Sequence, residues 1–317
     1  MTFSSGASTL TDGDTNGVVD IFVHDLHTGE TSRVSVASDG TQGNLSSLRP
    51  AISGEGRMVA FISYADNLVE GDTNRLLDVF VHDRQTGQTR RVSVASDGTE
   101  ADDEVYDPGI SADGRFVSFT SRAFTLAEND TNSVCDERGN PTPNCLDVFV
   151  HDLETGATTL VSVASDGTIG NAESGMDHVP PALSADGRYV AFWSAASNLV
   201  PGCRGDIFIR DRVAGQTTCV SLAWNGAFGN SNSWLPSISA DARVIAFDSE
   251  ATNLVPEPDT NDNTDIFLRI MQTEPSAIGL LRPSVAPSRD PLWLVGILLG
   301  AALLLLALRG TRKPPQP

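Results

Sequence analysis

The chain has 317 residues, of which 41 are acidic and 21 basic, so its formal net charge is −20 at pH 7. Phosphate groups repel a surface of this charge, and the composition therefore argues against nucleic acid as a partner. A solvated exported domain, or a domain that binds cations, fits the same charge.

One phrase returns five times between residue 1 and about residue 270. Each copy contains an anchor phenylalanine in an apolar segment, at Phe3, Phe61, Phe119, Phe192 and Phe247. The first two steps are 58 residues each, the third is 73 and the fourth is 55. Self-similarity at such a period indicates one supersecondary unit that is copied and stacked, each copy burying its apolar face against its neighbours.

Each unit reads as four short strands in which apolar and polar residues alternate. In chain order these strands carry P-x-I-S, R-x-V-A-F, D-x-F-V-H-D and R-V-S-V-A-S. Turn dipeptides separate them, as in Asp113-Gly114, Thr86-Gly87 and Asp97-Gly98. No segment of the repeats has a sustained helical period. The sequence therefore predicts an all-β fold, a β-propeller with five recognisable four-stranded blades, of which the first and last are incomplete.

The two ends depart from the repeat. The first unit begins inside its second strand at Phe3, and the last unit loses its fourth strand after Arg269. One interpretation is that the given chain starts late, which agrees with the absence of a basic, apolar export signal in residues 1–6. The alternative is a degenerate first blade that residues 272–281 complete.

The repeat resembles a known family in two of its motifs. A proline begins P-x-I-S-A-D-G-R at Pro108, with variants at Pro50, Pro181 and Pro236, and an aspartate begins D-[IV]-F at Asp20, Asp78, Asp147, Asp206 and Asp265. These motifs are similar to those of the TolB-like, WD40-like propeller repeat. The resemblance covers most of residues 1–270 and implies the propeller fold. Such propellers serve as partner-binding platforms, peptidase lids or solute-binding modules, so it implies no single activity.

An acidic loop precedes the third strand of several units and suggests a calcium site. In the first unit it places oxygen-bearing side chains at positions 1, 3, 5 and 9, with glycine at position 6, similar to the D-x-D-x-D-G-x-x-D calcium loops of other propellers. The candidate ligands are Asp12, Asp14, Asn16 and Asp20, then Glu70, Asp72, Asn74 and Asp78, and Glu257, Asp259, Asn261 and Asp265. The alternative is an Asx-rich turn whose side chains bond to local backbone amides, with no metal.

The third strand repeats a histidine at His24, His82 and His151. A metal or acid–base role is conceivable, but units four and five carry Arg210 and Arg269 at this position. A structural hydrogen bond repeated around the array explains that exchange better. The aspartates that follow the histidines read as turn formers.

Four cysteines are absent from the repeat consensus and come in two pairs. Cys135 and Cys145 bracket an insertion in the third unit, and Cys203 and Cys219 flank a strand of the fourth. An even count of paired cysteines predicts two disulfides in an oxidising compartment. One alternative is that the four cysteines are free thiols. A zinc site is a weaker alternative, because the sequence has no C-x-x-C motif and no close Cys/His cluster.

Residues 292–308 are apolar and uncharged, and at 1.5 Å per residue they span about 25 Å as a helix. Arg309, Arg312 and Lys313 follow, and positive residues favour the cytoplasmic side. We therefore expect a propeller domain over residues 1–272, a linker over 273–290, a transmembrane helix over 291–309 and a short basic cytoplasmic tail over 310–317. A sorting signal that is cleaved after export is the alternative to a retained anchor.

The sequence contains neither a G-x-S-x-G elbow nor an H-E-x-x-H motif. The sequence thus predicts an exported, membrane-anchored propeller that calcium stabilises. It would act as a binding or scaffold module for a protein or a cell-envelope polymer. A different class stays open, namely a carbohydrate-active or other hydrolytic propeller with carboxylates at the central channel.

Overall fold

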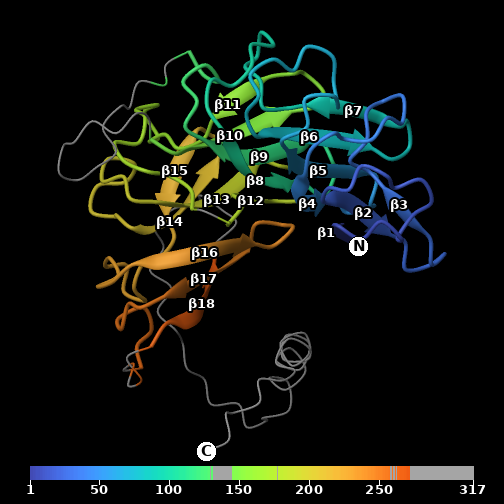
Figure 1. Ribbon diagram of the computed structural model, residues 1–317. Coiled ribbons are helices and arrows are strands. Elements are labelled where there is room, and N and C mark those ends of the chain that lie inside the picture. Colours follow the sequence, from blue (N-terminus) through green and yellow to red (C-terminus); the bar gives the residue numbers. More distant parts are fainter. Residues whose placement is uncertain are drawn as a thin grey trace, which may run out of the picture. The chain divides into compact units, whose positions relative to one another are not determined.

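The computed structural model describes residues 1–128, 130, 145–176, 178–257, 259, 261 and 263–271. In this part of the chain, five antiparallel sheets follow one another in sequence, consistent with propeller blades (Figure 1). Blade 1 consists of β1 (Thr2–Ser5), β2 (Asp20–His24) and β3 (Thr31–Arg33). Blade 2 consists of β4 (Ser47–Ile52), β5 (Met58–Ser63), β6 (Asp78–Asp83) and β7 (Gln88–Arg91).

The later blades repeat this plan. Blade 3 consists of β8 (Val105–Ile110), β9 (Phe116–Ser121), β10 (Asp147–Asp152) and β11 (Thr158–Leu160). Blade 4 consists of β12 (Ala182–Leu183), β13 (Tyr189–Ser194), β14 (Asp206–Asp211) and β15 (Gln216–Cys219). Blade 5 consists of β16 (Ser233–Ile238), β17 (Val244–Ser249) and β18 (Asp265–Ile270). Blades 1 and 5 therefore have three described strands each, the first lacking the innermost strand and the last lacking the outermost, as the sequence predicts.

The anchor phenylalanines hold each blade together. Phe61 of β5 lies directly opposite Phe80 of β6 in the strand register, and the two rings stack with centroids 6.0 Å apart. The same pair recurs in all five blades, with centroid distances between 5.8 and 6.0 Å. Stacked aromatic pairs add to the stability that burial of their area supplies. The copied phenylalanine is thus a core residue.

The fourth strand differs from the sequence prediction. It covers T-x-R, as in Thr31–Arg33, and the following V-S-V-A-S segment contributes only an isolated bridge such as Val94 to Glu100. The reason is the serine of that segment. Ser93 Oγ accepts a hydrogen bond from the Val79 amide at 3.1 Å and donates one to Asp78 Oδ1 at 2.5 Å, so a side chain takes the place of a ladder partner.

The repeated histidine is structural, as predicted. His82 Nδ1 lies 2.9 Å from Thr89 Oγ1, and that hydroxyl donates to the Val36 carbonyl of the preceding blade at 2.5 Å. Blade 4 keeps the bond with its arginine, because Arg210 Nη1 donates to Thr217 Oγ1 at 3.0 Å. Burial lowers the pKa of His82, so the ring is neutral at pH 7.

The arginine of the S-A-D-G-R turn also has a structural role. Arg57 binds both carboxylate oxygens of Asp83, with Nε and Nη2 at 2.9 and 2.6 Å, and blades 3 and 4 repeat the pair. Hydrogen bonds from Arg57 hold the pKa of Asp83 well below its usual range. Asp83 also accepts a hydrogen bond from the Gln85 amide at 2.9 Å, which confirms its predicted role in the turn.

Candidate functional site

The first strands of blades 2 to 5 lie next to one another in sequence order, and we call these four strands, β4, β8, β12 and β16, the inner edge. Three of them contain an irregularity just before the repeat proline. Arg49, Asp107 and Leu235 adopt φ angles of 52°, 52° and 54°, and the strand register shifts at each. Left-handed backbone is uncommon in residues other than glycine, and clusters of such residues often mark functional sites.

At the inner edge, side chains from different blades contact one another. Arg49 Nη1 lies 2.6 Å from Asp107 Oδ1, and Asp107 Oδ2 accepts a hydrogen bond from the His178 amide at 2.9 Å. His178 precedes β12 and has a φ of 71°, and its Nδ1 contacts Arg49 Nη2. A β-bulge re-aims side chains in this way at many binding sites. Blades 2, 3 and 4 therefore jointly form this cluster.

The cluster presents positive charge to solvent. The Asp107 side chain is only 2% exposed, whereas Arg49 is 33% exposed and His178 is exposed. Burial raises the pKa of the Asp107 carboxyl, while Arg49 and the His178 amide oppose the shift. The buried carboxylate fixes the guanidinium in place, so that the exposed side of the pair is cationic on a protein of net charge −20.

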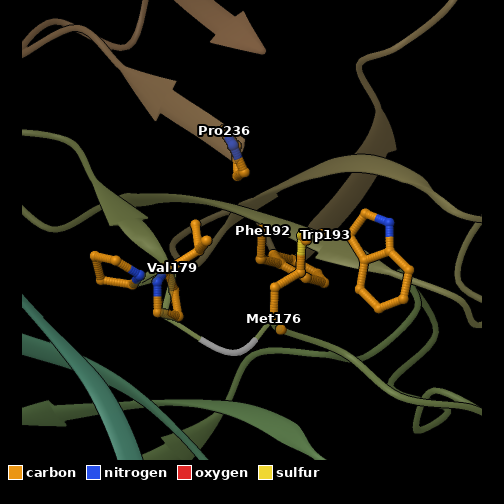
Figure 2. A pocket seen from close by; sticks show the side chains of 8 residues that line it. Met176, Val179, Phe192, Trp193 and Pro236 are labelled. Carbon is orange, nitrogen blue, oxygen red and sulfur yellow. The ribbon is translucent and has the colours of Figure 1, made fainter. Parts of the chain in front are cut away.

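A small apolar cavity lies close to this part of the inner edge. Met176, Val179, Phe192, Trp193 and Pro236 surround it (Figure 2). Its volume is about 10 Å³, which is near the smallest space that holds a single water molecule. An organic ligand does not fit inside it.

The acidic loop of blade 1 encloses an arginine. Arg33 Nη1, from the end of β3, lies 3.0 Å from Asp14 Oδ1 and 3.8 Å from Asp20 Oδ2. The Asn16 side-chain amide donates to Asp20 Oδ2 at 2.8 Å, while its oxygen accepts a hydrogen bond from the Val18 amide. Asp12 points to solvent. The loop is thus an Asx turn that is closed by a guanidinium.

Blade 2 repeats this arrangement with one more acid. Arg91 Nη1 lies 3.1 Å from Asp72 Oδ1, 3.5 Å from Asp78 Oδ2 and 2.5 Å from Glu100 Oε1. Asp72 Oδ1 and Asp78 Oδ2 are buried and accept no hydrogen bond, so the guanidinium compensates their charge. Burial, with repulsion from Asp78, raises the pKa of Asp72 to about 6, and Arg91 opposes the shift. Glu70 is exposed.

Calcium prefers six to eight oxygen ligands around one centre. In blades 1 and 2 a guanidinium lies between the carboxylates, and the position-1 acids Asp12 and Glu70 are exposed. Among the described residues, one His/Cys/Asp/Glu cluster has ligand atoms close enough for a metal, namely Cys203, Asp206 and Cys219, and its two sulfurs are bonded to each other. Calcium therefore stays a prediction.

Blade 5 has no described outer strand to supply an arginine. There the Asn261 side-chain amide donates to Asp265 Oδ2 at 3.2 Å, and Asn261 Oδ1 accepts a hydrogen bond from the Asn263 amide at 2.8 Å. Asp259 Oδ1 accepts from the Asn261 amide at 3.0 Å, and Glu257 is exposed. These are again contacts of an Asx turn.

A disulfide joins Cys203 to Cys219, as the sequence predicted, with Cα atoms 6.2 Å apart. Aligned on the repeat, Cys203 stands where blade 2 has Asp72, and Cys219 stands where blade 2 has Arg91. A covalent bond in blade 4 therefore takes the place of an ion pair in blades 1 and 2. For the other predicted pair, Cys145 is buried, while Cys135 lies outside the described residues.

The predicted linker, transmembrane helix and cytoplasmic tail also lie outside the described residues. In the part of the chain that is described, no helix is long and apolar enough to cross a membrane.

Sequence reasoning missed the inner-edge cluster. The available signal was the residue before the repeat proline, which differs in chemical type between units: Arg49, Asp107, Pro180 and Leu235. The fold does not dictate the residue at a position that changes between copies of one strand, so such a position is a candidate for function. Its backbone conformation, and the approach of His178, are not visible in the sequence.

No protein-family model and no curated protein matches the chain. The structure is similar to TolB from Acinetobacter baumannii, at 15% identity and a TM-score of 0.42 over 80% of this chain and 47% of that one. It is also similar to the tricorn protease (16%, 0.40, 76% and 18%) and to an acylaminoacyl peptidase from Pyrococcus horikoshii (15%, 0.43, 79% and 33%). The chain thus spans about half the length of TolB. These similarities, to TolB and other β-propeller proteins, concern the fold alone.

Proposed function

We propose that the chain is a binding module that holds an acidic segment of a partner protein against its inner edge. The observation that supports this is the cluster of Arg49, Asp107 and His178, in which a buried carboxylate orients a guanidinium whose outer side is exposed. Guanidinium groups held in this way recognise carboxylates with defined geometry. Leu235, exposed on the next blade, supplies apolar area beside it.

The same geometry weighs against the hydrolytic alternative. Glycoside hydrolysis requires two carboxyl groups that flank the scissile bond, one of them free to donate a proton. Asp107 is a buried carboxylate of the inner edge, and both its oxygens are engaged by Arg49 and the His178 amide. It therefore acts as a positioning residue for Arg49 rather than as an acid.

Site-specific photo-crosslinking tests the proposal. A benzophenone amino acid at Leu235 in the full chain, expressed in its host, is expected to crosslink one discrete partner. The same probe at Val213, an exposed residue outside the inner edge, provides the control. An Arg49→Gln change is expected to abolish the crosslink while the far-UV circular dichroism spectrum shows that the blades are still folded. Crosslinks that are identical at both positions, or that survive Arg49→Gln, would refute the proposal.

We further propose that the module is exported and held at the membrane by residues 291–309, with its C-terminus in the cytoplasm. The uncharged segment, the basic residues that follow it and the Cys203–Cys219 disulfide support this, because disulfides persist in oxidising compartments. External protease added to intact cells should digest the blades and spare a fluorescent protein fused after Pro317. Protection of the blades would contradict this orientation.

A further inference from the structure

Neighbouring blades meet through two copied apolar faces. The outgoing face of a blade carries the apolar residues of its D-x-F-x strand, such as Val79 and Val81 of β6. The incoming face of the next blade carries the anchor phenylalanine and its neighbour, such as Phe119 and Val117 of β9. These four residues share one buried cluster, and each of the other three junctions buries the equivalent residues. The contact is thus made four times within the chain.

Among the residues that the structure describes, nothing covers the outgoing face of blade 5. Ile266 and Leu268 of β18 occupy the positions of Val79 and Val81, yet they are 69% and 67% exposed where those valines are 0% and 2%. Ile270 on the same face is 74% exposed. Contiguous exposed aliphatic residues on an unpaired edge strand are a feature that stable proteins cover with another surface.

The complementary incoming face of blade 1 is likewise not covered by any described residue. Ala7 is exposed, and Phe3 and Leu10 are only half-buried, although their counterparts in blades 2 to 5 are buried throughout. Blades 1 and 5 are the first and last sheets of the array (Figure 1), and no strand of one packs substantially on a strand of the other in the described residues. The chain therefore carries both halves of a contact that it already makes four times, one half at each end.

We propose that the outgoing face of blade 5 docks on the incoming face of blade 1 of a second copy of this chain. The two faces match because each derives from the same repeat as a pair that is buried elsewhere in the molecule. The contact is heterologous, with different surfaces on the two partners, so copies join head to tail. It is independent of the inner edge and of any ligand bound there.

Isotope-mixed crosslinking of the full chain in detergent tests this arrangement. A benzophenone amino acid replaces Leu268 in ¹⁵N-labelled protein, which is mixed with unlabelled wild type and irradiated, and the peptides are identified by mass. We expect crosslinks between labelled position 268 and unlabelled peptides from residues 1–24. Crosslinks confined to one label would show closure within a single chain and overturn the proposal. Crosslinks to residues 272–317, or none at all, would overturn it as well.

Sedimentation with charge variants provides the second measurement. Leu268→Glu adds a charge to the exposed face without altering a buried contact, and Val213→Glu is the matched control. Wild type and control are expected to associate between about 1 and 100 μM. Leu268→Glu should require a protein concentration that is roughly tenfold higher, or more, to associate to the same extent. A wild type that sediments as a monomer throughout, or a variant that associates equally, refutes head-to-tail docking.

Discussion

Replacing Arg91 by leucine is expected to destabilise blade 2 strongly. Leucine is the natural residue at the equivalent position of blade 3, Leu160, so the strand accommodates its shape. The change removes the cation between Asp72 and Asp78, whose side chains are 3% and 1% exposed. Removing one partner of a buried ion pair costs about 3–5 kcal/mol, because the remaining charge is left uncompensated. A loss of that size is a large part of the stability of a typical domain.

The defect should depend on pH with a definite sign. Without Arg91 the folded-state pKa of Asp72 rises further above the unfolded value, since Arg91 is the group that lowers it. The penalty therefore grows as pH rises above the unfolded pKa and disappears on acidification, when the carboxyls take up protons. Urea unfolding of wild type and Arg91→Leu at pH 7 and pH 4.5 measures this. The difference in free energy of unfolding should be several-fold smaller at pH 4.5.

Calcium provides a further arm of the same experiment. Once the guanidinium is gone, three carboxylates lack a cation between them, and millimolar calcium should raise the melting temperature of Arg91→Leu more than that of wild type. Arg90→Leu, an exposed neighbour on β7, changes the net charge equally and serves as control. The reasoning is refuted if Arg90→Leu is destabilised as much as Arg91→Leu, or if calcium raises the melting temperatures of wild type and Arg91→Leu equally.

Three other changes test the fold. Replacing Cys203 and Cys219 by alanine should lower the free energy of unfolding by about 3 kcal/mol, given a sequence separation of 16 residues, and an unchanged urea midpoint would contradict the disulfide. Phe119→Ala, in a fully buried stacked pair, should cost about 3–5 kcal/mol, whereas Leu26→Ala on the surface should change thermal unfolding little. Gly109→Ala would place a Cβ 2.9 Å from a backbone oxygen of blade 4, so circular dichroism should show a lower melting temperature; full stability would show that the blades can separate there.

The repeat made much of the fold predictable because its signals are local. Each unit contains its own alternating strands, D-G or T-G turns and anchor phenylalanine. Comparing five copies removes the ambiguity that the strand assignment would have in a single copy. The equivalence of His82 and Arg210 was also readable, since both reach a threonine seven residues ahead. The fourth strand was misplaced because Ser93 folds back on Asp78, a bond that competes with the ladder and leaves no mark in hydrophobic alternation.

The acidic loops show where spacing alone is insufficient. Carboxylates at alternate positions suit a calcium ion and a guanidinium equally well, and the choice depends on which side chain the outer strand delivers. Arg33 reaches Asp14 from the neighbouring outer strand, so the partner is absent from the local motif. In blade 4 the aligned positions became Cys203 and Cys219, and the pair was readable because two cysteines outside the repeat consensus flank one strand.

By itself the sequence determined that this protein is a stack of all-β units with unequal ends, because each unit encodes its own strands and turns. Only the tertiary structure decided what the inner edge presents. Arg49 and Asp107 lie 58 residues apart, and Asp107 and His178 lie 71 apart, so they meet only when three blades are stacked and their first strands are bulged. The physical reason is that blade packing depends on buried faces, while the exposed end of an inner strand is free to differ from copy to copy.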